Sequence, residues 1–205
     1  MKSRRTVSFH QSFSLNRFLV LLFFVILIFF SSSSSALELE DVLKQVKVTP
    51  PDRVAFREER FNSLLKEPMI LTGILEYPKT GQLVKIVETP FRESMQVDGD
   101  QVEISRDGKK RRLSLKNRNP IKVMLQSIES ILSGQADAIA DHFKTELTGS
   151  NENWQLQLTP RSSRLAAHLE SITVEGDCNF IKSILFRMSN GEWQRMEIVP
   201  PSPES

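Results

Sequence analysis

Short alternating segments separated by turn signals occupy the middle of the chain. From Met69 to Tyr77 every second residue is apolar or glycine, which is the period of a strand with one buried face. Turn signals follow at Pro78-Lys79-Thr80-Gly81, Asp98-Gly99 and Asp107-Gly108, because proline fixes φ and Asp-Gly accepts the positive φ of hairpin turns. This spacing predicts an antiparallel meander of strands over residues 69–77, 83–89, 92–97, 101–105 and 111–115.

Three segments carry the apolar period of an amphipathic helix instead. Residues 37–48 show it and are followed by Pro50-Pro51, which cannot continue a helix. Residues 121–132 show it again, and Gly134 is a typical residue just after a last helical turn. Residues 137–147 carry fewer apolar positions, and we predict a second, shorter helix there.

Further strands are predicted on both sides of these two helices. The clearest alternation is Trp154, Leu156 and Leu158 between glutamines, and Asn190-Gly191 is a strong hairpin signal. We predict a polar loop at 161–164, a turn at Gly176-Asp177, and strands over 54–65, 151–160, 168–175, 180–188 and 193–199.

The first of these strands places Phe56, Glu58 and Arg60 on one face. Charged residues beside a core phenylalanine have two explanations. Either this face leaves the core partway along the strand, or Glu58 and Arg60 pair with each other.

The order of elements is helix, strands, two helices, strands. It predicts an α+β fold in which the helices are segregated from one antiparallel sheet. A sheet of this many strands curls, and its concave side must be filled by side chains, by helices or by a ligand.

The first 36 residues predict a secretory signal peptide. Basic residues precede an uninterrupted apolar run, Phe18–Phe30, and the serines that follow end in Ser34-Ser35-Ala36, with small residues at the cleavage positions. The run is shorter than the roughly 20 residues of a spanning helix, although an uncleaved anchor is the alternative. We expect cleavage after Ala36, a single domain over 37–199 and a short proline-rich tail over 200–205.

Without that segment the balance of charge changes sign. The chain has 27 Lys+Arg and 25 Asp+Glu, and four of the basic residues lie in the first 36, which leaves 23 against 25. Bulk charge therefore gives no case for nucleic-acid binding. Lys109-Lys110-Arg111-Arg112 forms a local basic cluster, either a solvated tip that guards a strand edge or a contact for anionic lipid head groups or an acidic partner.

Residues with catalytic or ligating chemistry are few. Cys178 is the only cysteine, so no internal disulfide can form, and we expect it to be buried or half-buried. His142 and His168 lie in separate predicted elements, and the sequence has no Ser-centred elbow, HExxH motif or Cys/His metal spacing. We expect no enzyme, no metal site and no cofactor.

In order and spacing, six motifs resemble those of the LolA-type lipoprotein carriers and of their divergent LolA-like relatives in Gram-negative bacteria. They cover nearly all of the chain after residue 36: Phe56-x-Glu58-x-Arg60, Pro68-Met69-x-x-x-Gly73-x-Leu75-x-Tyr77, Val97-Asp98-Gly99-Asp100, Leu132-x-Gly134, Trp154-x-Leu156-x-Leu158-x-Pro160 and Asn190-Gly191-Glu192. The resemblance implies an unclosed antiparallel β-barrel whose mouth is covered by helices, with a hydrophobic cavity between them.

The resemblance also implies a function. In the founding carriers the cavity takes acyl chains of lipoproteins released from the inner membrane and delivers them to an outer-membrane receptor. We therefore expect a monomeric periplasmic carrier for lipoprotein acyl chains or another lipid-like amphiphile, with an inner-membrane donor and an outer-membrane acceptor protein. The alternative is a periplasmic sensor or chaperone subunit that binds lipid or peptide and signals to a protein partner.

The expected cavity and lid residues come from the apolar faces of the predicted elements. They are Phe56, Leu71, Leu75, Tyr77, Val84, Ile86, Met95, Val97, Ile104, Met124, Leu125, Ile128, Ile131, Trp154, Leu156 and Leu158. The founding carriers have an arginine that holds the lid, just after the strand matching Gly73 to Tyr77. Lys79 is the nearest substitute here, and we expect it to contribute to lid control.

Overall fold

The computed structural model describes residues 37–50, 52–116 and 119–200. The predicted signal peptide and the tail beyond Pro200 lie outside the described residues. None of the helices in these ranges combines the length and the apolar character that crossing a bilayer requires.

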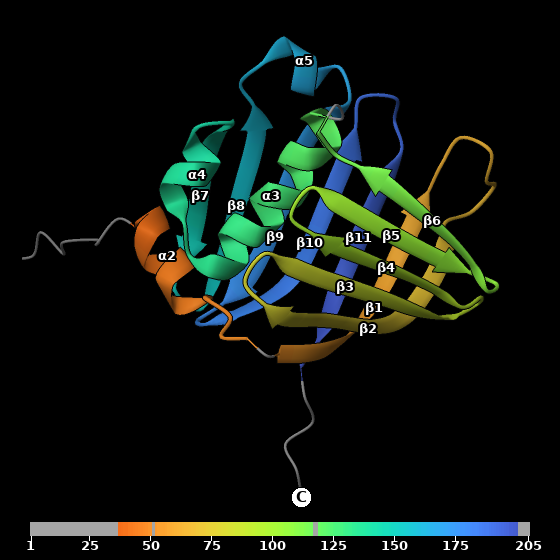
Figure 1. Cartoon of the computed structure of the whole chain (residues 1–205). Helices are drawn as coiled ribbons and strands as arrows, with labels where there is room; N and C mark the ends of the chain where they lie inside the picture. The colour runs from red at the N-terminus through yellow and green to blue at the C-terminus, as the bar shows by residue number, and fades with distance from the viewer. Residues whose placement is uncertain (1–36, 51, 117–118, 201–205) are drawn as a thin grey trace, which may run out of the picture. The chain divides into compact units, whose positions relative to one another are not determined.

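Eleven strands in the described ranges form one antiparallel sheet, which does not close on itself (Figure 1). Their order across the sheet is β6-β5-β4-β3-β2-β1-β11-β10-β9-β8-β7. The first and last strands pair in the middle, with Phe56 opposite Ile198, so the edges are β6 and β7. The bounds are β1 (Asp52–Phe61), β2 (Met69–Lys79), β3 (Gln82–Thr89), β4 (Glu93–Asp98), β5 (Gln101–Arg106), β6 (Lys109–Ser114), β7 (Phe143–Ser150), β8 (Asn153–Pro160), β9 (Leu169–Asp177), β10 (Phe180–Met188) and β11 (Trp193–Val199).

Four described helices accompany the sheet: α2 (Leu39–Gln45), α3 (Asn119–Ser133), α4 (Ala136–Ala140) and α5 (Ser163–Ala166). Helices α3 and α4 lie in the connection from edge strand β6 to edge strand β7. Figure 1 shows α2, α3 and α4 on one face of the curved sheet, and buried residues of all three join one core with β8–β10. The predicted fold class, an unclosed antiparallel sheet with helices segregated on it, is confirmed.

The meander follows the turn signals of its sequence, although the first predicted turn begins too early: Pro78 and Lys79 belong to β2, and the turn is formed by Thr80 and Gly81. Asp107 and Gly108 both have positive φ, 51° and 76°, as a two-residue hairpin turn requires. Alternation then continues through each strand, so that Leu71, Gly73 and Tyr77 of β2 are buried while intervening residues are less so.

The helix predicted over 137–147 is wrong in its second half. Helix α4 ends at Ala140 and strand β7 begins at Phe143. Phe143 and Leu147 are four residues apart, a spacing that fits a helical face and equally one face of a strand. Pairing decides the outcome, because Leu147 lies opposite Leu156 in a hairpin with β8 and Phe143 is fully buried.

The turn predicted at Gly176-Asp177 is also wrong, since both residues belong to β9 and the turn is formed by Cys178 and Asn179. Gly176 is needed inside the strand because a side chain there would collide with the indole of Trp154. Cys178 is exposed, with a positive φ of 41°, which corrects the expectation that it is buried. The predicted polar loop at 161–164 contains the start of α5, where the Ser162 hydroxyl accepts a hydrogen bond from the Leu165 amide.

The apolar core is unevenly distributed. One large cluster joins α2, α3 and α4 to β8, β9 and β10. Two small clusters lie in the meander half: Phe56 with Leu71 and Val87, and then Val97, Val102 and Leu115. Between the large cluster and the small ones the interior is left open.

Candidate functional site

A cavity of about 970 Å³ separates α3 from the inner face of the sheet. Its helical wall comes from Ile121, Met124, Leu125, Ile128 and Leu132, and its opposite walls include Val54, Leu75, Leu83 and Met95 of β1–β4 and Ile184, Phe186, Met196 and Ile198 of β10 and β11. Ligand pockets in proteins typically span about 300–1,000 Å³ and are mostly apolar. The space is large enough for the chain of an amphiphile.

Helix α3 contributes to the cavity because of its sequence period. The lining residues of α3 recur every three or four positions and therefore form one stripe. Ile131, seven residues after Met124, lies at the edge of the same stripe, is 1% exposed, and packs into the large core cluster. Met124, Ile128 and Leu132 also pack against that cluster, so one apolar stripe contributes both to the core and to the roof of the cavity.

Half of the residues predicted for the cavity and lid line this space. They are Leu75, Tyr77, Val84, Met95, Val97, Met124, Leu125 and Ile128. Their role in holding a ligand stays a prediction.

The other eight lie elsewhere in the described part of the chain. Ile131, Trp154, Leu156 and Leu158 belong to the large core cluster, while Phe56 and Leu71 belong to a small one. Ile104 packs beside Val97 and Val102. Ile86 is on the outer face, since it lies opposite Ile74 and Ser94 and alternates with the inward Lys85 and Val87. The alternation of a strand shows which face is apolar but not whether that face meets a void or a side chain.

Lys79 lies at the end of β2 and is paired with the last residue of β4. Its ammonium is 3.7 Å from Asp98 Oδ2, and both side chains are more than half exposed. A role for Lys79 in lid control stays a prediction.

Two polar contacts that the sequence did not single out join α3 to its surroundings. Lys122 Nζ lies 2.6 Å from Asp100 Oδ1 in the β4–β5 turn, and the Val48 amide donates to the Leu132 carbonyl at 2.8 Å. Asp100 belongs to the motif Val97-Asp98-Gly99-Asp100, and this motif was the one sequence feature that could have pointed to the contact.

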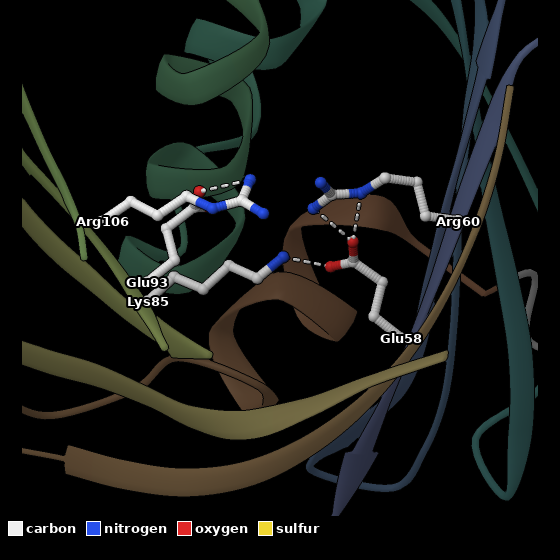
Figure 2. A network of polar contacts seen from close by, with 5 residues as sticks. All are labelled: Glu58, Arg60, Lys85, Glu93 and Arg106. Atoms are coloured by element: carbon white, nitrogen blue, oxygen red, sulfur yellow. Dashed lines mark hydrogen bonds and ion pairs between the residues drawn. The ribbon is translucent and has the colours of Figure 1, made fainter. Parts of the chain in front are cut away.

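A buried ion network lies on the same inner face. Glu58 is 1% exposed, and its Oε1 accepts from Arg60 Nε and Nη2 at 3.0 and 2.7 Å. Lys85 donates to Oε2 of the same carboxylate, and Figure 2 shows the three side chains converging. Of the two explanations for this strand face, the pairing of Glu58 with Arg60 is confirmed, and the face is still buried at Glu58.

Lys85 also lines the cavity, where its side chain is 13% exposed. Burial lowers the pKa of Lys85 below the ordinary lysine value, although the charge and hydrogen bond of Glu58 act in the opposite direction. The nearby charge of Arg60 lowers this pKa further. At the cavity wall, Lys85 and Arg60 share the single carboxylate of Glu58.

Within the described ranges, no three or more His, Cys, Asp or Glu side chains gather as metal ligands would. What the site offers chemically is apolar surface with buried charge at one side.

Comparisons with known proteins agree with the geometry at the level of family. The family model described as outer membrane lipoprotein carrier protein LolA-like matches residues 31–200. No curated protein sequence matches the chain.

Solved structures resemble this chain only weakly. The LolA superfamily protein NE2245 from Nitrosomonas europaea has a TM-score of 0.42 at 9% identity, covering 80% of this chain and 93% of its own. LprF from Mycobacterium bovis has a TM-score of 0.38 at 12% identity, covering 82% and 94%. A chain of the Pseudomonas aeruginosa MucA/MucB complex has a TM-score of 0.36 at 16% identity, covering 78% and 55%.

Proposed function

This chain belongs to the family of LolA-like outer membrane lipoprotein carrier proteins, and we propose that it carries an amphiphile through the periplasm. The cargo is a lipoprotein acyl chain or a comparable lipid-like chain, held in the cavity between α3 and the sheet and moved toward the outer membrane. An inner-membrane protein supplies the cargo and an outer-membrane protein accepts it. The signal-peptide pattern of the first 36 residues supports export.

The single observation that carries this proposal is the apolar cavity of about 970 Å³. Each methylene that leaves water for such a space contributes about 0.8 kcal/mol. Met95, Met124 and Met196 lie in its walls, and thioether side chains adapt easily to chains of different length or branching. Binding of an apolar chain is therefore favourable without any specific polar contact.

Release requires that α3 can leave the sheet. Its apolar stripe is shared between the cavity and the large core cluster, so opening α3 breaks fewer packed contacts than it would above a completely filled interior. The Lys122–Asp100 ion pair and the packing of Leu125 against the Val97–Val102–Leu115 cluster join α3 to the meander half. An acceptor that binds an open state better than the closed one shifts the population and frees the cargo.

Native mass spectrometry of the full chain, after export in a Gram-negative host, tests the proposal. We expect the protein to retain an adduct of lipid mass, and Leu75→Glu to lose it, because the carboxylate enters the cavity wall. Ile74→Glu is the matched control: the adjacent residue of β2 lies on the opposite face, across from Ala55 and Ile86.

Circular dichroism of both variants checks that each is folded. Where Leu75→Glu unfolds, Met124→Trp fills the same cavity with apolar bulk and gives a second test. Retention of the adduct by a folded cavity variant contradicts the proposal. A bare protein mass together with a tightly bound protein partner favours a sensor or chaperone subunit instead.

A further inference from the structure

The inner face of β3–β6 changes character from row to row. Directly paired residues of antiparallel strands share one face, so the register of these four strands defines three rows. The rows, starting from the side of α3, are Leu83-Val97-Val102-Leu113, then Lys85-Met95-Ile104-Arg111, and then Val87-Glu93-Arg106-Lys109. The first is wholly apolar, the second is mixed, and the third is mostly charged.

Helix α3 covers the apolar end of this gradient. Leu125 packs against the cluster that contains the first row, and the cavity is lined by two members of the first row and two of the second, Lys85 and Met95. In Figure 1 the β5–β6 turn, next to the third row, lies at the right, at the end of these strands away from α3. The apolar cavity therefore continues into charged surface where the helical roof stops.

The basic cluster of edge strand β6 is divided by strand alternation. Lys110 and Arg112 point to the outer face, where both hold Glu103, at 2.9 and 2.8 Å. Lys109 and Arg111 belong to the inner rows, and among the described residues no ion pair involves either of them. Lys110 and Arg112 are thus neutralised on the outer face, whereas Lys109 and Arg111 add positive charge to the inner face.

Cations exceed carboxylates on this part of the inner face. In Figure 2, Arg60 and Arg106 point toward one another from opposite sides. The side chain of Lys85 extends from its strand toward Glu58. Arg106 lies 3.8 Å from Glu93 and stacks on Phe91, 3.9 Å from the ring centroid. We define the cationic strip as Arg60, Lys85, Arg106, Lys109 and Arg111. Among the described residues of the same strand faces, the carboxylates beside them are Glu58 and Glu93.

We propose that the cationic strip binds the anionic head group, a carboxylate or a phosphate, of the amphiphile whose apolar chain lies in the cavity. This inference rests on the proposed function and narrows its cargo to anionic amphiphiles. The Lys85 ammonium has three donors and gives one to Glu58, so it can also hold an anion at the cavity wall. Arg60 gives Nε and Nη2 to Glu58 and keeps the N–H groups of Nη1, while the guanidinium of Arg106 presents a planar fork suited to carboxylate and phosphate oxygens.

Edge protection alone does not account for this arrangement. Charges guard a strand edge equally well from either face of the strand. On the outer face, however, Glu103 neutralises the basic residues, while on the inner face Arg106, Lys109 and Arg111 extend the charge of Lys85 from the cavity wall to the edge. A path from the apolar cavity to a surface where cations outnumber carboxylates matches the two ends of one anionic amphiphile.

Two fluorescent probes that differ only in charge test the inference: dansyl-undecanoic acid and its methyl ester, titrated into the full chain. We expect the acid to bind about tenfold more tightly, since one charge-assisted hydrogen bond contributes on this scale. The double variant Lys109→Gln with Arg111→Gln is expected to lose most of that difference. Lys110→Gln with Arg112→Gln removes the same formal charge from the outer face of the same strand and is expected to keep it.

Each outcome supports or overturns a defined statement. Equal affinity of the wild-type chain for acid and ester overturns the anionic head group while the proposed carrier function stands, whereas no binding of either probe contradicts the carrier function itself. If both double variants lose the acid–ester difference in affinity equally, bulk charge alone explains that difference. This result overturns the proposed role of the cationic strip. Sedimentation with phosphatidylglycerol vesicles separates the two sources of the anion. An inner-face variant that loses vesicle binding but keeps the affinity for the acid probe also overturns the proposal.

Discussion

The two halves of the sheet are stabilised in different ways. On the side of β8–β10 the described residues form one cluster of fifteen buried apolar side chains together with α2, α3 and α4. On the side of β1–β6 there are two clusters of three, a cavity, and a buried carboxylate held by two cations. One half is filled by its own side chains and the other leaves space.

The difference shows how a small domain can contain a cavity and remain folded. An unfilled interior costs stability, because the atoms that line it lose packing contacts. Here the filled half supplies most of the apolar burial and anchors α3 through Ile131. The hollow half leaves part of the α3 stripe facing the cavity, as the proposed loading and release would require.

The largest effect should follow from breaking the ion network of the hollow half. Glu58→Ala leaves Lys85 and Arg60 without their carboxylate, and we expect a loss of about 3–5 kcal/mol in the free energy of unfolding. Glu59→Ala is the matched control, since the next residue pairs with Arg57 at 2.8 Å on the partly exposed outer face and should cost at most about 1 kcal/mol. Urea unfolding followed by circular dichroism measures both.

The pH dependence of this loss has a defined sign. Glu58 raises the pKa of Lys85 against the lowering caused by burial, so removing Glu58 lowers that pKa further. The destabilisation is complete wherever Lys85 is protonated and shrinks as the pH rises through its folded pKa toward the ordinary lysine value. Equal and small effects of Glu58→Ala and Glu59→Ala would show that the inner network is not a structural element of this half.

A smaller effect should separate a filled position from a hollow one. Leu156 is fully buried in the large cluster, and Leu156→Ala should cost about 2–5 kcal/mol in free energy of unfolding because it opens a new void. Met95 is half-buried beside an existing cavity, and Met95→Ala should cost about 1 kcal/mol or less. Similar losses for both variants, measured by urea unfolding, would mean that the cavity is packed in solution.

The fold could be predicted from the sequence wherever local signals and tertiary pairing agree. The meander follows from its turn dipeptides, and β11 has the predicted bounds, Trp193–Val199. The prediction for residues 143–150 was wrong because the spacing of Phe143 and Leu147 fits a helix and a strand equally well. Only the pairing with β8 decides for the strand. The turn predicted at Gly176 was wrong because this glycine makes room for the indole of Trp154. Trp154 lies 22 positions away in the sequence, so the local pattern around Gly176 gives no sign of it.

The site was predictable only in part for a related reason. Apolar alternation selected Leu75 and Met95, which line the cavity, but it selected Leu156 and Leu158 equally well, and these fill the core. Whether an inward side chain meets a void depends on what lies opposite, which is set by the path of α3. Lys85 was not selected at all, because a lysine between apolar residues gives no sign that a buried carboxylate 27 positions earlier receives it.

The smallest expected effect concerns the outer face of β5 and β6, where a partly exposed carboxylate pairs with two exposed cations. Hydrogen bonds from Lys110 and Arg112 lower the pKa of Glu103 below the ordinary glutamate value. A lowered carboxyl pKa contributes stability above the unfolded value and loses it as the pH falls through the folded one. We expect Lys110→Gln with Arg112→Gln to move the pKa of Glu103, followed by NMR, back toward the ordinary range, with little change in the free energy of unfolding at neutral pH.

The contrast with Glu58 is the reason for the measurement. Both carboxylates hold two cations, but only Glu58 is closed off from water. Screening by solvent should therefore make the ion pairs of Glu103 with Lys110 and Arg112 nearly dispensable. A marked loss of stability in this outer-face variant would show that edge strand β6 depends on its ion pairs, and would also disqualify the variant as a control for the cationic strip.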